Sequence, residues 1–75
     1  MAYWIKERHN PQLGVYYVPY GELDAKQAKE FNNSLYGSNV MLKFKTRKEY
    51  QEKIDALKAN GERVHPECLV YSRVK

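Results

Sequence analysis

A strand pattern and a helix pattern meet at Thr46, and this junction constrains the fold more than any other feature of the chain. Apolar residues alternate with others over residues 40–45, which predicts a strand with one buried and one solvent-exposed face. Thr46-Arg47-Lys48-Glu49 has the form of a capping box, with Thr46 as the N-cap and Glu49 at the N3 position. We therefore expect a helix from residue 47 to about Asn60, because Asn60-Gly61 supplies a left-handed stop.

The first half of the chain predicts a hairpin followed by a helix. Residues 2–8 and 15–20 are rich in aromatic and β-branched types, and a loop with Asn, Pro and Gly separates them. Pro19 has no N–H to donate, so the second strand should lie at an edge of the sheet or end there. Asp24 is a favoured capping residue, and we expect a helix from about Asp24 to Tyr36.

These elements predict one α+β domain over residues 1–75, in the order β-β-α-β-α, with a small antiparallel or mixed sheet and two helices on one face. Residues 62–75 form either a last strand, over 68–74, or a loose extension. A chain of 75 residues has room for one core. The lone cysteine, Cys68, cannot form a disulfide within the chain, so packing must supply the stability. We expect the core to contain Ile5, Val18, Phe31, Leu35, Val40, Leu42, Phe44, Ile54 and Leu57.

Few residues could support catalysis or metal binding. His65 and Cys68 are close enough in sequence to share a turn, but a structural zinc needs four ligands and no second Cys/His pair completes the set. His9 is far away in sequence. The chain also has no nucleophile elbow, no phosphate-cradling glycine loop and no paired-carboxylate spacing. We therefore expect no enzymatic activity, no metal and no cofactor.

Membrane insertion and export are also not predicted. No segment approaches the roughly 20 apolar residues that cross a bilayer, and the first residues lack a basic stretch followed by an apolar one. A single cysteine suits a reducing compartment. These features predict a cytoplasmic protein.

An aromatic and basic surface is the strongest candidate for function. The chain has seven tyrosines, one tryptophan and a net charge of +4, and such rings are enriched at protein interfaces. If Ile5 faces the helices, the strand alternation turns its neighbours toward an open face of the sheet. The candidate binding residues are Trp4, Lys6, Arg8, Tyr16, Met41, Lys43, Lys45 and Arg47.

Three kinds of partner fit this surface. An acidic protein is one, and a single-stranded nucleic acid or RNA is the alternative, because rings stack bases and cations follow phosphates. The positive charge is modest and the chain lacks the glycine-aromatic pattern of an RNA-recognition motif, so we favour the protein partner. Self-association through a strand edge or the aromatic face, giving a homo-oligomer, is the third. A competing interpretation points Trp4 inward as the largest core residue.

Two segments resemble short accessory proteins of bacteriophages and prophages. They are Lys6-Glu7-Arg8-His9-Asn10-Pro11-Gln12-Leu13-Gly14, followed by Val15-Tyr16-Tyr17, and Leu35-Tyr36-Gly37-Ser38-Asn39-Val40-Met41. The resemblance brings no functional residues with it, but it implies a context. Small phage proteins often bind and block a host bacterial protein or complex, for example as anti-CRISPR or other counter-defence inhibitors. It thus implies an inhibitor that acts in the cytoplasm of a bacterial host.

Overall fold

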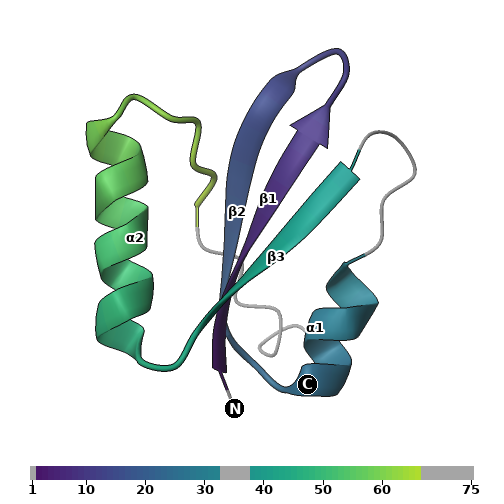
Figure 1. Ribbon diagram of the computed structural model, residues 1–75, viewed down its shortest axis with the longest axis vertical. Helices are drawn as coiled ribbons and strands as arrows, with labels where there is room; N and C mark the ends of the chain where they lie inside the picture. The colour runs from purple at the N-terminus through teal and green to yellow at the C-terminus, as the bar shows by residue number, and fades with distance from the viewer. Residues whose placement is uncertain (1, 33–37, 67–75) are drawn as a thin grey trace.

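The fold is a three-stranded antiparallel sheet with two helices (Figure 1). The computed structural model describes residues 2–32 and 38–66. Its elements are β1 (Ala2–Asn10), β2 (Gly14–Leu23), α1 (Ala25–Phe31), β3 (Ser38–Phe44) and α2 (Arg47–Ala59). The sheet has the order β2-β1-β3, with both neighbouring pairs antiparallel. The α+β class and the order β-β-α-β-α are confirmed, and β2 lies at an edge of this sheet, as Pro19 predicted.

A bulge interrupts the pairing of β1 with β2. Trp4 lies opposite Gly21 and Ile5 lies opposite Pro19, so Tyr20 is the extra residue. Gly21 has a φ of 76°, which is a left-handed conformation that a glycine adopts without steric cost. Tyr20 lies on the side of α1 by the same alternation as Val18, and the bulge shifts the alternation after it so that Leu23, opposite Ala2, packs on that side too.

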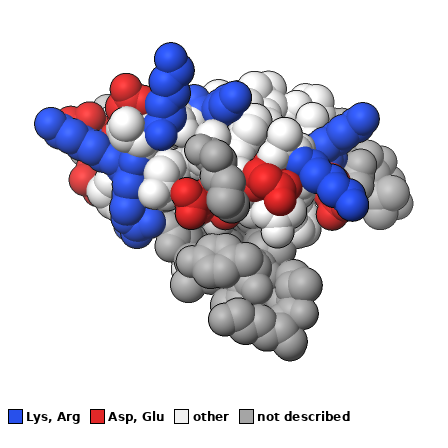
Figure 2. All heavy atoms as spheres, turned by 90° about the horizontal axis from the view of Figure 1, so that it is seen from below, with Lys and Arg blue, Asp and Glu red and all other residues white. Residues whose placement is uncertain are grey.

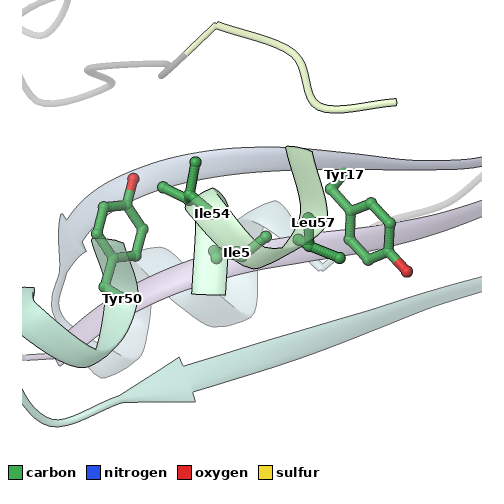
Figure 3. Packing of buried hydrophobic residues seen from close by; sticks show 5 residues of the cluster. All are labelled: Ile5, Tyr17, Tyr50, Ile54 and Leu57. Carbon is green, nitrogen blue, oxygen red and sulfur yellow. The ribbon is translucent and has the colours of Figure 1, made fainter. Parts of the chain in front are cut away.

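The two helices lie on opposite faces of the sheet, which corrects the prediction that they share one face. Ile5 packs with α2, in a cluster with Tyr17, Tyr50, Ile54 and Leu57 (Figure 3). Its neighbour Trp4 packs in a second cluster, which includes Ala28 of α1. Consecutive residues of a strand point to opposite faces, so β1 presents apolar side chains to both faces and each face needs a helix to cover it.

Helix α1 is shorter than the sequence pattern predicted. It begins as expected, because the Asp24 side chain accepts from the Gln27 amide at 2.7 Å and the Gln27 side chain accepts from the Asp24 amide at 3.2 Å. It ends at Phe31, with Asn32 as its C-cap, and the predicted end at Tyr36 is wrong. The Asn32 amide donates to the Lys29 carbonyl at 3.3 Å, which closes the last turn.

Helix α2 matches the prediction closely. The Thr46 hydroxyl accepts from the Glu49 amide at 3.2 Å, and Asn60 is the C-cap. The buried residues of α2 are Tyr50, Ile54 and Leu57.

The core differs from the predicted one in its members, because Tyr17, Tyr20, Leu23 and Tyr50 are buried and were not predicted. Ile5, Ile54 and Leu57 are buried as expected, and Val18, Phe31, Leu42 and Phe44 are partly buried against the clusters. Val40 is 45% exposed, so its assignment to the core was wrong. It lies on the face of α2, but the α2 cluster includes Leu42 and Phe44 of β3 and does not reach Val40. Leu35 lies outside the described residues.

The segment after α2 runs beside β2. The Tyr17 amide donates to the Arg63 carbonyl at 2.8 Å, and the His65 amide donates to the Tyr17 carbonyl at 2.9 Å. Val64 and Tyr17 thereby form a single parallel bridge. The first described residues of the predicted C-terminal strand or extension therefore contact the sheet through this one bridge. The strand predicted over residues 68–74 lies outside the described residues.

Candidate binding surface on the sheet

Six of the eight predicted binding residues share one face of the sheet. The pairing places Trp4 opposite Lys43 and Lys6 opposite Met41, and it places Arg8 opposite Tyr16. Directly opposite residues of an antiparallel pair point to the same face, and Trp4, Lys6 and Arg8 alternate along β1. This is the face that carries α1, so it is partly covered and not open as we had expected.

Lys45 and Arg47 lie outside the strand pairing that defines this face. Lys45 is exposed and follows the last residue of β3, Phe44. The Arg47 guanidinium carbon lies 6.0 Å from the centroid of the Tyr3 ring, and Tyr3 packs with the α2 cluster. Lys43, Lys45 and Arg47, which are close in sequence, are therefore not all in the sheet, because the chain turns into α2 after Thr46.

Trp4 is neither an open interface residue nor a fully buried one. Its ring is half-buried against the cluster that contains Ala28. The Lys43 ammonium lies 5.8 Å from the centroid of the ring, in a cation–π contact. The indole Nε1 is buried, and it has no hydrogen-bond partner among the described residues. Burying an N–H group without a hydrogen-bond partner costs free energy. The packing of the described residues around Trp4 therefore leaves one hydrogen-bond donor unsatisfied.

A shallow groove of about 290 Å³ opens beside Trp4, between α1 and β3. We call it the Trp4 groove, and it is lined by Trp4, Ala25, Ala28, Lys29, Asn32, Met41 and Lys43. A second hollow of about 240 Å³ adjoins it and shares Trp4, Ala25 and Lys43. The side chains of Lys29 and Lys43 are exposed at the groove, and no acidic residue within residues 2–32 and 38–66 lines it, although Asp24 lines the adjoining hollow. The groove thus combines an aromatic and apolar lining with two cations.

Sequence reasoning missed the contribution of α1 to this surface. Lys29 and Asn32 join Trp4, Met41 and Lys43 only because α1 packs on their face of the sheet. The capping residue Asp24 indicated where this helix begins. It carried no signal for which face.

The remaining residues of this face have contacts within the chain. The Lys6 ammonium lies 5.6 Å from the Tyr20 ring centroid, and burial, with the nearby Arg8 charge as a smaller cause, lowers the pKa of Lys6. Arg8 Nη1 donates to Asn39 Oδ1 at 3.1 Å. The Tyr16 and His65 rings lie 4.9 Å apart. These side chains are held in place by contacts within the chain, and none of them is among the described residues that line the Trp4 groove.

Charges of both signs mix on the surface at the end of the molecule drawn in Figure 2. There the Lys and Arg side chains stand in two groups, and Asp and Glu side chains lie between and beside them. A protein that follows a phosphate backbone usually presents a continuous basic stripe. The described residues at this end of the molecule do not present one.

The titratable residues do not assemble a metal site in the part of the chain that the structure describes. No three His, Cys, Asp or Glu side chains gather within residues 2–32 and 38–66. His9 Nε2 instead lies 2.6 Å from Glu7 Oε2, and Cys68 lies outside the described residues. Neither α1 nor α2 is long and apolar enough to span a bilayer.

Comparisons with known proteins do not assign this chain to a family. The resemblance to phage accessory proteins therefore stays a prediction from the quoted segments. Searches against protein-family models, curated proteins and solved structures found no match to this chain.

Proposed function

We propose that this chain is a small non-enzymatic binding protein that docks on an acidic segment of a protein partner through the Trp4 groove. One observation carries the proposal: the groove has a lining of Trp4, Met41 and alanine side chains and exposes Lys29 and Lys43, with no acid among the described residues that line it. Protein interfaces commonly combine an aromatic anchor in a pocket with charged groups around it. Two lysines favour an acidic segment, which they would attract and orient.

The ring contacts favour a protein partner over a single-stranded nucleic acid. Base stacking requires ring faces that are free to receive a base. Lys43 lies over the Trp4 ring, and Tyr20 stacks on Phe31 with centroids 5.3 Å apart. A nucleic acid would have to displace these contacts, whereas an acidic peptide can pair with Lys43 in place.

The resemblance to phage accessory proteins supports a partner in a bacterial host. On that basis the chain would inhibit or modulate a host protein or complex. A phage origin and a counter-defence role, such as anti-CRISPR inhibition, are predictions of that resemblance alone.

Two matched double charge reversals test the proposal. K29E/K43E alters the groove, and K48E/K53E makes the same change of charge at exposed positions of α2. The parent and both variants are immobilised and exposed to bacterial lysate, and the retained proteins are identified. We expect the parent and K48E/K53E to retain the same acidic protein in stoichiometric amount, and K29E/K43E to lose it. Titration of that purified protein should change the fluorescence of Trp4, the only tryptophan.

Two outcomes would contradict the proposal. One is retention of no stoichiometric protein at any ionic strength, and the other is equal loss in both variants. A single-stranded oligonucleotide is titrated in parallel. Binding that falls steeply with salt and is lost in K29E/K43E would identify a nucleic acid as the partner, because phosphate contacts release counterions.

A further inference from the structure

Strand β3 has one edge that no described strand covers. Within residues 2–32 and 38–66, β3 pairs with β1 alone and stands last in the order β2-β1-β3. Figure 3 shows it at the lower margin of the sheet. The opposite edge strand, β2, differs because the segment around Val64 bridges to it. An uncovered edge presents backbone N–H and C=O groups that can pair with another strand.

The usual features that block edge pairing are sparse in β3. Its seven residues, Ser38–Phe44, contain no proline and only one charged side chain, Lys43. Its register with β1 is regular, whereas the register of β2 with β1 contains a bulge. Val40 also leaves 45% of its surface exposed on this strand. Natural edge strands are more often protected by several charges, a proline or a bulge.

We propose that the β3 edge binds a second copy of this chain, with the two β3 strands antiparallel and related by a two-fold axis at Met41. This register pairs all seven residues of both strands, since Met41 is the central residue of Ser38–Phe44. A two-fold dimer uses the same surface on both copies. The two sheets would join into one continuous sheet of six strands.

The side chains of β3 fit this register. Val40 of one copy lies opposite Leu42 of the other, on the face of α2, so the exposed valine gains an apolar neighbour. Lys43 lies opposite Asn39 of the second copy, so the strand's only charge does not face its own equivalent. Directly opposed like charges would destabilise a strand pair, and this register avoids them.

The dimer would also pair the two Trp4 grooves. Lys43 and Met41 point to the face of α1 in both copies, so both grooves would open on the same face of the joined sheet. The two Lys43 positions would be about 14 Å apart along the strands, at about 3.4 Å per residue. The dimer itself does not depend on the proposed docking of an acidic partner, and its test uses the purified chain alone.

Sedimentation equilibrium of the full chain tests the proposal, with measurements up to millimolar protein because one strand pair is a small interface. We expect a monomer–dimer equilibrium. Val40→Lys should abolish the dimer over this range, because a lysine would replace the valine that faces Leu42. Val15→Lys is the matched control, since Val15 is 38% exposed on the opposite edge strand and on the same face. A monomer at every concentration, or a dimer that persists in Val40→Lys, would overturn the proposal.

Single cysteines then report the register in a Cys68→Ser background. Met41→Cys should cross-link under mild oxidation, because a two-fold axis at Met41 brings its two copies within about 5.5 Å, which a disulfide can bridge. Asn39→Cys and Lys43→Cys should not cross-link, because each faces the other position in the second copy. Equal cross-linking at all three positions would contradict the register and overturn the proposal.

Discussion

The phenolic oxygen of Tyr50 accepts a hydrogen bond from the backbone amide of Gly21 at 2.9 Å. Tyr50 lies on α2 and is fully buried, while Gly21 lies at the bulge of β2, where the regular strand pairing is interrupted. The bulge removes the amide from the ladder of hydrogen bonds. The Tyr50 hydroxyl therefore satisfies a buried amide and also fixes the position of α2 on the sheet.

Tyr50→Phe should destabilise the fold by about 1–3 kcal/mol, because it leaves the buried Gly21 amide without its acceptor. Urea unfolding followed by circular dichroism measures the change. Tyr3→Phe is the control, because the two side chains contact each other through their rings, whose centroids lie 5.5 Å apart. Equal loss of stability in both variants would show that the hydrogen bond has no special role.

Thr46→Ala should lower the free energy of unfolding by about 1 kcal/mol, because the Glu49 amide loses its side-chain acceptor. Thr46→Ser keeps a hydroxyl at the same position and should retain most of the stability. The same unfolding experiment compares the two variants. If alanine and serine behave alike, the cap does not contribute to the stability of α2.

Sequence signals that act within a few residues predicted most of the helices and strands. The face on which α1 packs and the Trp4 groove depend on contacts between distant parts of the chain, which these signals do not predict. The start and end of α2 follow from Thr46 and Asn60, which act within a few residues of themselves. The face chosen by α1 depends on the apolar side chains it meets, among them Leu23, which a bulge turns toward it. The alternation of β1 and β3 correctly grouped Trp4 with Lys43. It could not reveal the groove, because α1 supplies one wall of it.

Ile5→Ala should cost about 2–5 kcal/mol, whereas Val40→Ala should change stability by less than about 1 kcal/mol. Ile5 has no exposed surface and Val40 is 45% exposed. Both residues point to the face of α2, so the comparison separates burial from strand position. Thermal unfolding of dilute protein measures both. A large loss in Val40→Ala would restore the core assignment that the structure overturned.

Tyr17 should make the fold sensitive to alkaline pH. Burial raises the pKa of its hydroxyl above the usual value, and the charges of Glu7 and Glu62 and a hydrogen bond with the Glu7 side chain raise this pKa further. The folded state therefore holds the phenolic proton more tightly than the unfolded state. The resulting stability is fully present below about pH 10, where a tyrosine in an unfolded chain ionises. It is lost as the pH rises from there through the folded pKa.

Tyr17→Phe should remove this part of the alkaline loss, because phenylalanine has no proton to release. The measurement is the free energy of unfolding in urea at about pH 8 and about pH 11, on either side of the usual tyrosine pKa, and the difference is compared between parent and variant. Glu7→Gln should reduce the alkaline loss in part, since it removes one of the negative charges that raise the Tyr17 pKa. A variant Tyr17→Phe that loses as much stability as the parent over this range would show that the ionisation of Tyr17 is not coupled to folding.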